Sequence, residues 1–191
     1  MTFADDTMMR NRIKNKRAKL SLAQQNLESL KVCTKISQMQ CYKEANNIAY
    51  YQATFGEIHL ESLWESAHAQ GKICYFPAIK ADKTLLFLPA TPTTPFKPNR
   101  FGIMEPDLSP DCAIELKYLH LMMVPLVAFD AHCNRLGMGG GSYDRTLYQQ
   151  KTGFLLGVAY PFQQVEKISP HSWDIPMDAV VTSEAIYNRL G

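Results

Sequence analysis

The chain has 191 residues, of which 46% are hydrophobic, and a formal net charge of +2. This length and hydrophobic content favour a globular protein with one full core, and the small net charge does not by itself indicate a nucleic-acid or membrane partner. We find no apolar run of about 18 residues and no apolar segment followed by a small-residue cleavage site, so we expect neither a membrane span nor a secretion signal. The expectation is one α/β domain over residues 1–191, present as a monomer.

The cysteines exclude two classes of small protein. They are odd in number and scattered, and no two form a C-x-x-C pair: Cys33, Cys41, Cys74, Cys112 and Cys133. Neither a disulfide framework nor a zinc site is indicated. A reducing compartment fits best, and we expect the protein to be cytoplasmic.

A strongly basic segment opens the chain. Residues 10–19 contain six positive charges, and a helix over about 8–20 would put Arg10, Lys14 and Arg17 on one stripe. The apolar residues Met9, Ile13 and Leu20 would lie on another face. Three interpretations stay open: a solvated basic helix, a clamp on an anionic ligand, or a nucleic-acid surface, although no aromatic residues are interleaved with the charges.

The next segments alternate between helix and strand patterns. Ser21 to Gln24 resembles a capping box, which predicts a helix from Ser21 to about Cys41 with Leu27, Leu30 and Ile36 inward. A strand is predicted over 47–53, a helix over about 57–70 ended by Gly71, and a second strand over 72–77. A strand–helix–strand unit of this length predicts a parallel pair with a right-handed crossover, hence an α/β fold.

The later elements are predicted in the same way. Strands are expected over 84–89, 118–129, 154–159 and 178–182, with an extended connection over 90–98, a helix over 143–151, and a terminal helix that Ser183 caps and that runs to Leu190. Side chains that follow the carboxyl end of a parallel strand face the ligand crevice, which makes Phe55, Glu57 and His59 site candidates as well as ordinary loop residues.

The most informative stretch runs from Val124 to Arg145. A short apolar segment leads into residues 137–141, four of which are glycines, and Arg135 precedes them while Tyr143 and Asp144 follow. Glycines let backbone N–H groups approach an anion, but the Walker and dinucleotide patterns both fail here. A cation, backbone donors, a carboxylate and an aromatic ring together suit a metal-bound nucleotide phosphate and a flat heterocycle. A tight turn without a ligand is the alternative.

Magnesium is the metal that these residues suit. It keeps several waters and binds through one or two carboxylates together with phosphate oxygens. Asp144 could share such an ion with a carboxylate of the later connection, Asp174 or Asp178. Each of these carboxylates is also compatible with a cap or surface role.

Three features together resemble the 5-formyltetrahydrofolate cyclo-ligase family, also called methenyltetrahydrofolate synthetases. They are the basic N-terminal helix, F-G-I-M-E-P at Phe101 to Pro106, and P-L-V-A-F-D…R-L-G-M-G-G-G-S-Y-D-R at Pro125 to Arg145. The resemblance implies a three-layer α/β/α fold with a mostly parallel central sheet, similar to phosphosugar isomerases and coenzyme A transferases. It also implies ATP- and magnesium-dependent conversion of 5-formyltetrahydrofolate to 5,10-methenyltetrahydrofolate, with release of ADP and phosphate.

The resemblance implies roles for individual residues. ATP binding falls to Arg10, Lys14, Arg135, Leu136, Gly137, Met138, Gly139, Gly140, Gly141, Ser142 and Tyr143. Folate binding falls to Thr54, Phe55, His59, Glu105, Met138, Gly139, Gly140, Gly141 and Ser142. Arg135, Tyr143 and Asp144 are the expected catalytic residues, and Asp144 and Asp174 the expected magnesium ligands, with Asp178 as the alternative to Asp174. Members often carry tyrosine where this chain has Ser142.

Other functions remain as alternatives. An isomerase or acyl-transfer enzyme on the same fold lacks a matching glutamate or lysine centre, and Ser142 lacks the partners of a catalytic serine. A folate- or nucleotide-binding protein without catalysis would bind substrate but not turn over ATP. An RNA-binding module would show steeply salt-dependent binding.

Overall fold

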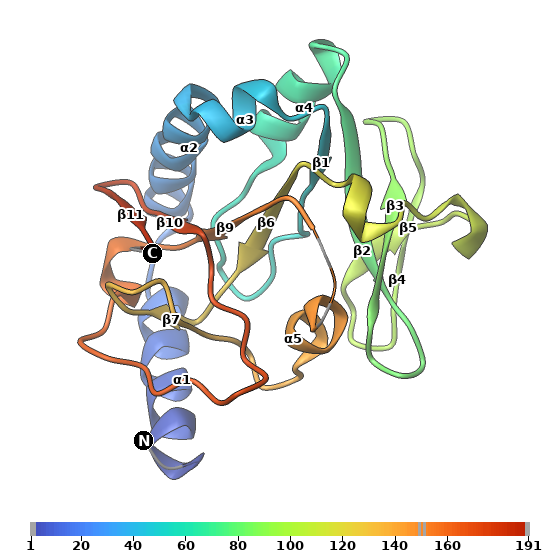
Figure 1. The fold of residues 1–191 in the computed structure, drawn as a ribbon. Helices are drawn as coiled ribbons and strands as arrows, with labels where there is room; N and C mark the ends of the chain where they lie inside the picture. Colours follow the sequence, from blue (N-terminus) through green and yellow to red (C-terminus); the bar gives the residue numbers. More distant parts are fainter. Residues whose placement is uncertain (1–2, 149, 151, 190–191) are drawn as a thin grey trace.

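The computed structural model describes residues 3–148, 150 and 152–189. Its centre is a seven-stranded sheet in the order β11-β10-β9-β6-β1-β2-β3 (Figure 1). The strands are β1 (Asn47–Ala49), β2 (Ile73–Ile79), β3 (Leu85–Pro89), β6 (Leu121–Pro125), β9 (Phe154–Val158), β10 (Ala179–Val181) and β11 (Ile186–Asn188). Strands β10, β9, β6, β1 and β2 pair in parallel, and the edge strands β11 and β3 are antiparallel to their neighbours. The predicted mostly parallel central sheet is confirmed.

Both faces of the sheet are covered. On one face, buried side chains of α2 (Leu22–Gln38), α3 (Gln40–Glu44) and α4 (Glu61–Ala69) pack on the strands. On the other face, the cover comes from α5 (Ser142–Leu147), from the small ladder of β7 (Ala128–Phe129) and β8 (Arg135–Leu136), and from the connection before β10. This second layer therefore contains more loop than helix.

Two elements lie outside these layers. One is helix α1 (Phe3–Ala18), which precedes α2 along one side of the molecule (Figure 1). The other is the ladder of β4 (Phe96–Pro98) and β5 (Met104–Pro106), which lies at the opposite side. Short 3₁₀ turns occupy Pro110–Cys112, Leu116–Tyr118 and Pro161–Gln163. The segment over 90–98, expected to be an extended connection, therefore ends in a paired strand.

The sequences of two strands fit their positions in the sheet. Four of the five residues of β6 are buried, as expected for a central parallel strand that is covered on both faces. Its neighbour β9 contains Gly157, where an added Cβ would lie 2.8 Å from Leu126 and 3.0 Å from Val180. The glycine therefore allows the cover segment to approach this strand closely.

The predicted start of the second helix is confirmed, but its inward face is not. Ser21 accepts from the backbone N–H of Gln24, whose side chain accepts from the backbone N–H of Ser21, as in a capping box. Leu27 and Leu30 were expected inward and are 53% and 59% exposed. The buried stripe is instead Ser29, Val32, Cys33 and Ile36. Ser29 belongs to it because its hydroxyl accepts from the His59 N–H, a contact that apolar periodicity cannot show.

The predicted terminal helix is wrong. Residues 186–188 form β11, which pairs antiparallel with β10. The chain reverses because the Thr182 hydroxyl accepts from the N–H groups of Glu184 and Ala185, so Ser183 lies in a turn and caps no helix. Tyr187 then packs edge-on against Phe129, with ring centroids 5.0 Å apart. The predicted end at Leu190 lies outside the described residues.

Other predicted elements have different bounds. The helix expected from about residue 57 begins at Glu61, because residues 54–57 form a hydrogen-bonded turn, and Gly71 follows its end with φ +79° as expected of a C′ glycine. The segment expected as one strand over 118–129 is divided into a 3₁₀ turn, β6 and β7. Helix α5 ends at Leu147, and the predicted end at Lys151 lies outside the described residues.

The parallel strands bring their carboxyl ends to one edge, where Tyr51, Ile79 and Pro125 stand at or just after the ends of β1, β2 and β6. All three residues line the same cavity. Within the described residues, no helix is both long enough and apolar enough to cross a bilayer.

Candidate active site

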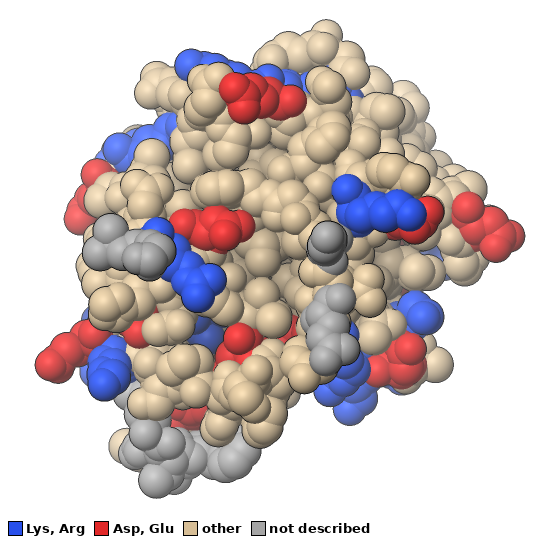
Figure 2. Space-filling view, viewed as in Figure 1, with Lys and Arg blue, Asp and Glu red and all other residues tan. Residues whose placement is uncertain are grey.

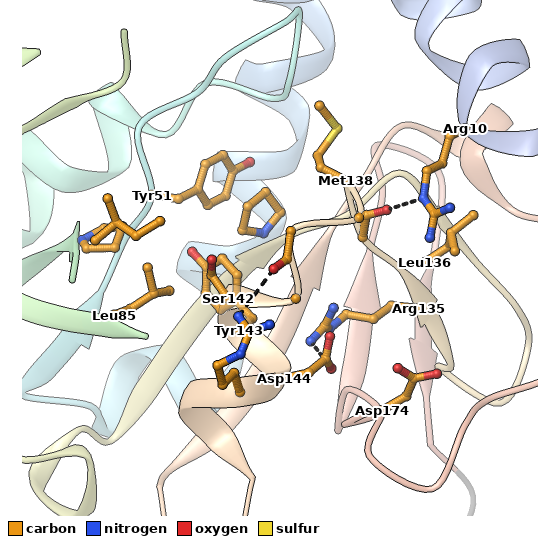
Figure 3. A pocket seen from close by; sticks show the side chains of 18 of the residues that line it. Arg10, Tyr51, Leu85, Arg135, Leu136, Met138, Ser142, Tyr143, Asp144 and Asp174 are labelled. Carbon is orange, nitrogen blue, oxygen red and sulfur yellow. Dashed lines mark hydrogen bonds and ion pairs between the residues drawn. The ribbon is translucent and has the colours of Figure 1, made fainter. Parts of the chain in front are cut away.

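A cavity of about 690 Å³ lies at this edge of the sheet (Figure 3). Its volume lies within the range of about 300–1,000 Å³ that small-molecule and cofactor sites span. The wall that the strand ends provide is largely apolar, with Tyr51, Pro77, Ile79, Leu85 and Pro125. The facing wall is the glycine loop, which we define as residues 137–141.

The glycine loop is held to the N-terminal helix. Arg10 of α1 donates from Nε to the Gly137 carbonyl over 2.9 Å (Figure 3). The same guanidinium lies 3.9 Å from Asp6. Gly139 and Gly141 take φ values of +99° and +66°, which L side chains rarely adopt. The backbone path of the loop thus requires glycine at positions 139 and 141, and the loop is held by Arg10, which is 127 residues before Gly137 in the sequence.

An arginine–carboxylate pair lies beside the loop. Arg135 Nη2 donates to Asp144 Oδ1 over 2.6 Å, and the backbone N–H of Ile175 donates to the same oxygen over 3.0 Å. The Arg135 side chain is only 4% exposed, and its Nε has no hydrogen-bond partner among the described residues. Asp144 comes from the first turn of α5 and Arg135 from β8, so this pair joins the strand before the glycine loop to the helix after it.

A second carboxylate, Glu57, is buried in another part of the wall. Its Oε2 accepts from the Thr54 N–H over 3.0 Å, and its Oε1 lies 3.6 Å from the Arg17 guanidinium. Burial raises the pKa of Glu57, while the bond from Thr54 and the charge of Arg17 oppose that rise. Burial, together with the nearby Glu57 carboxylate, also raises the pKa values of the Tyr51 and Tyr143 hydroxyls, so both stay protonated at neutral pH.

The third carboxylate of the wall holds a turn in place. Glu105 Oε1 accepts from the Ile79 N–H over 2.9 Å and from the Asn99 amide over 2.6 Å. These bonds tie the turn that carries Phe101 and Ile103 to the end of β2. Phe101 is 57% exposed and lines the cavity, so this turn presents an aromatic ring at its opening.

The cavity collects most of the predicted site residues. Those that line it are Arg10, Thr54, Glu105, Arg135, Leu136, Gly137, Met138, Gly139, Gly140, Gly141, Ser142, Tyr143, Asp144 and Asp174. Lys14, Phe55 and His59 do not line it. Phe55 is 66% exposed at the tip of a turn with φ +50°, and His59 lines a second, smaller cavity beside Trp64. Lys14 lies one turn further along α1 than Arg10, the residue that reaches the loop.

The structure separates the two candidates for the second magnesium ligand. Asp174 lines the cavity near Asp144 (Figure 3), and its Oδ2 accepts from the His171 N–H over 2.7 Å. Asp178 does not line the cavity, because its Oδ2 accepts from the Leu155 N–H over 2.7 Å at the start of β9. The described residues contain no group of three or more metal-ligating side chains, but magnesium needs only one or two carboxylates when phosphate oxygens complete its shell. Asp144 and Asp174 fit that need.

Some cavity residues are not among the site residues that the sequence predicts. Asp6, Asn99, Arg145 and Trp173 line the cavity, and Arg17 lies behind it against Glu57 and Met138. The basic stripe had included Arg17 as a candidate cation, but nothing in the sequence marked it as fully buried. Predicting that Asn99 lines the cavity requires knowledge of the turn that Glu105 holds to β2.

Comparison with known proteins gives a consistent result. The model of the family described as "5-formyltetrahydrofolate cyclo-ligase family" matches residues 2–183. The 5-formyltetrahydrofolate cyclo-ligase of Haemophilus influenzae is 40% identical over 173 residues, covering 88% of this chain and 92% of that protein. The enzyme of the same name from Escherichia coli K12 is 35% identical over 179 residues, covering 92% and 98%.

Solved structures agree with these relatives. The NMR structure of Aquifex aeolicus 5,10-methenyltetrahydrofolate synthetase matches with a TM-score of 0.85 and 30% identity, covering 97% of this chain and 94% of that one. A Mycoplasma pneumoniae 5,10-methenyltetrahydrofolate synthetase matches in fold, with a TM-score of 0.75 at 22% identity. The fold, the motifs and the relatives together show that this chain belongs to the 5-formyltetrahydrofolate cyclo-ligase family.

Proposed function

We propose that the cavity binds ATP along the glycine loop and 5-formyltetrahydrofolate against the facing wall, and that the residues between them catalyse ring closure. Membership of the family gives the overall reaction, the ATP-dependent conversion of 5-formyltetrahydrofolate to 5,10-methenyltetrahydrofolate. One observation carries the assignment of sites: a single cavity joins a glycine loop flanked by Arg10 and Arg135 to an apolar wall of strand ends.

The glycine loop suits the nucleotide phosphates. Gly139, Gly140 and Gly141 expose backbone N–H groups without side chains in the way, and Arg10 and Arg135 supply positive charge on either side. Magnesium, when bound to Asp144 and Asp174, would supply further positive charge against the phosphate oxygens. Asp144 would then bind the ion in place of part of its contact with Arg135. The Arg135 guanidinium would thereby become available to donate to the phosphates.

The facing wall suits a flat, reduced pterin. Tyr51, Leu85 and Phe101 offer apolar surface, while the Glu57 and Glu105 carboxylates and Thr54 offer acceptors and a donor for ring nitrogens. Both carboxylates are already oriented by backbone N–H groups, those of Thr54 and Ile79. A ligand that meets oriented groups loses less conformational entropy on binding than one that must order them.

The chemistry explains why such a site needs no protein nucleophile. The oxygen of an N-formyl group is a poor leaving group, so the neighbouring N10 cannot close the ring until that oxygen is activated. In the proposed sequence the formyl oxygen attacks the γ-phosphate and ADP leaves, N10 adds to the activated carbon and loses its proton, and phosphate departs. The protein aligns the two ligands and stabilises the moving phosphoryl group, for which Arg10, Arg135 and the loop N–H groups are suited. Ser142 has no role as a nucleophile in this scheme.

The direct test follows the methenyl-folate chromophore. Purified protein is mixed with 5-formyltetrahydrofolate, magnesium and ATP, and ATP is omitted in the control. ATP-dependent appearance of the chromophore is the expected result. Folded protein that binds ATP and folate without forming product would refute the proposal and favour a non-catalytic binding protein, for which Ser142→Tyr is the next variant.

The face of the molecule shown in Figure 2 gives little support to the RNA-binding alternative. On the face shown in Figure 2, lysines and arginines are interspersed with acidic residues among the described part of the chain. An RNA-binding face typically concentrates basic residues in one patch. In addition, Arg10 and Arg17 of the basic helix are directed to the glycine loop and to Glu57.

A further inference from the structure

Arg145 is a cavity residue to which the sequence patterns assign no role. It follows Asp144 in α5 and lines the cavity beside the glycine loop. Its Nη1 donates to the Gly140 carbonyl over 3.3 Å, and its Nη2 lies 3.5 Å from the point where a Cβ on Gly141 would stand. The guanidinium is therefore folded over the end of the loop opposite to the one that Arg10 holds.

The backbone that carries Arg145 is fixed to the sheet. The hydroxyl of the next residue, Thr146, donates to the Ser142 carbonyl over 2.6 Å and accepts from the Leu85 N–H over 2.8 Å. Helix α5 is thereby attached to β3, and its consecutive residues Asp144 and Arg145 are held in different surroundings. Asp144 contacts Arg135 and Ile175, whereas Arg145 contacts the glycine loop.

The charges around the loop distinguish Arg145 from its neighbours. Arg10 has Asp6 at 3.9 Å, and Arg135 has Asp144 at 2.6 Å. Across the residues that the structure describes, Arg145 has no carboxylate within ion-pair distance, and its residue is exposed. The hydrogen bond from Arg145 to Gly140 is longer than the usual N–H···O range of about 2.7–3.2 Å and is therefore weak. Replacing it with a hydrogen bond to an anionic oxygen costs little free energy.

We propose that Arg145 is a further catalytic residue, which binds the terminal phosphate of the nucleotide and stabilises its charge during transfer. The proposal rests on the proposed function, because it requires ATP phosphates on the glycine loop. A guanidinium can donate two parallel hydrogen bonds to phosphate oxygens, which a lysine ammonium cannot reproduce in the same geometry. Arg10 would still hold one end of the loop, and Arg145 would contribute a charge that no carboxylate of the described residues neutralises.

The test compares three variants of the full chain. Arg145→Gln removes the charge, Arg145→Lys keeps it, and Arg12→Gln is a matched control, because Arg12 is an exposed arginine of α1 that does not line the cavity. We expect Arg145→Gln to lower kcat/KM for ATP by about a hundredfold, the lower end of the range seen when one electrostatic partner of a transition state is lost. The KM for 5-formyltetrahydrofolate should not change. Arg145→Lys should recover part of the loss, and Arg12→Gln should behave as wild type.

A binding measurement separates this role from a structural one. By titration calorimetry, Arg145→Gln should bind ADP and a non-hydrolysable ATP analogue more weakly than wild type, with the larger loss for the analogue, and should bind adenosine equally well. Equal affinity for the ATP analogue, or an equal loss for adenosine, would overturn the proposal. If Arg145→Gln folds poorly, the same comparison with Arg145→Lys decides. If the wild type binds nucleotide but forms no product, the proposed function fails, while the calorimetric comparison still decides whether Arg145 contacts the phosphates.

Discussion

The Arg17 guanidinium lies 3.6 Å from the Glu57 carboxylate, and the two side chains are 0% and 8% exposed. Arg17 comes from α1 and lies behind the cavity, and Glu57 comes from the turn after β1 and lines it, so the pair joins α1 to this wall. Arg17 also contacts the Met138 sulfur of the glycine loop at 3.9 Å. Its Nε and Nη1 have no hydrogen-bond partner among the described residues. Removing one partner of such a pair leaves a buried charge uncompensated.

We predict that Arg17→Met lowers the free energy of unfolding by about 3 kcal/mol at pH 8, the range for breaking a buried pair. The loss should be smaller at pH 5. Burial already raises the pKa of Glu57 above 4.5, and losing Arg17 raises it further. A carboxyl whose pKa is raised in the folded state stabilises the fold below its unfolded pKa, and this stability is lost as the pH rises through the folded pKa. Urea unfolding at the two pH values measures the difference.

The double variant Arg17→Met/Glu57→Gln supplies the control. Because it removes both charges, it should regain much of the stability at pH 8 and lose the pH dependence that the single variant shows. Equal losses at pH 5 and pH 8 in Arg17→Met would contradict the view that the Glu57 charge causes the instability.

The Arg135–Asp144 pair gives the second prediction. Arg135→Ala and Asp144→Asn should each lower kcat/KM for ATP by roughly 100-fold, comparable to losing one preorganised electrostatic partner. Because the two side chains are in direct contact at 2.6 Å, the double variant should lose less than the product of the two single effects. Steady-state rates, followed through the methenyl-folate chromophore, are measured for the wild type, the two single variants and the double variant. Near-normal rates in both single variants would remove the proposed roles.

The two aspartates of the later connection should behave differently. Asp174→Asn should raise the magnesium concentration needed for half-maximal rate, because Asp174 lines the cavity with Asp144. Asp178→Asn should instead lower the thermal midpoint, since its carboxylate accepts from the Leu155 N–H at the start of β9. Chelation of magnesium should abolish turnover of the wild type. A shifted magnesium dependence in Asp178→Asn alone would reverse this assignment.

Local patterns predicted the parts of the fold that depend on neighbouring residues. The capping box at Ser21, the parallel pair of β1 and β2, and the strand that leads to the glycine loop could all be predicted from short segments. The inward face of α2 could not, because its buried stripe includes Ser29, which bonds to a residue 30 positions away. The final strand was missed because Thr182 and Ser183 are equally good signals for a turn and for a helix cap.

In the candidate site too, the sequence could predict some residues and not others. Its glycine loop, Arg135 and Asp144 lie within ten consecutive residues, so the sequence displayed them together. Arg17 acquires its surroundings only when α1 meets the turn after β1 and the glycine loop, both far from it in the sequence. Asn99 and Arg145 contact Glu105 and Gly140, six and five positions away, but no sequence pattern shows that these side chains line the cavity.

The turn that carries Phe101 gives the fourth prediction. Glu105→Ala removes the acceptor for both the Ile79 N–H and the Asn99 amide, which releases the turn from β2. We expect the KM for 5-formyltetrahydrofolate to rise about tenfold, as for losing one to two hydrogen bonds, while the KM for ATP stays unchanged. The control is Lys97→Met on β4, whose ion pair with Asp107 is exposed and contributes little. A change in the KM for ATP alone would contradict the assignment of this wall to folate.

Gly139 and Gly140 form a matched pair for the last prediction. Both have room for a methyl group, since an added Cβ would stand 3.9 Å from Arg10 Nε at Gly139 and 3.9 Å from Ser142 Oγ at Gly140. They differ in backbone, because Gly139 has φ +99° and Gly140 is not among the positive-φ residues. An alanine at a positive φ costs roughly 1–3 kcal/mol of strain. Gly139→Ala therefore must distort the loop or destabilise it, whereas Gly140→Ala need not.

Because the loop is exposed at the cavity, we expect it to relieve this strain by shifting its peptide groups. Gly139→Ala should then lower kcat/KM for ATP by about tenfold or more, since roughly 1.4 kcal/mol of lost phosphate interaction corresponds to a factor of ten. Gly140→Ala should stay within about twofold of wild type by the same relation. Steady-state rates at varied ATP concentration distinguish the two variants. Equal losses would mean that the space beside the loop, filled by the bound nucleotide, matters more than its backbone conformation, because a methyl group at either position would then obstruct the phosphates.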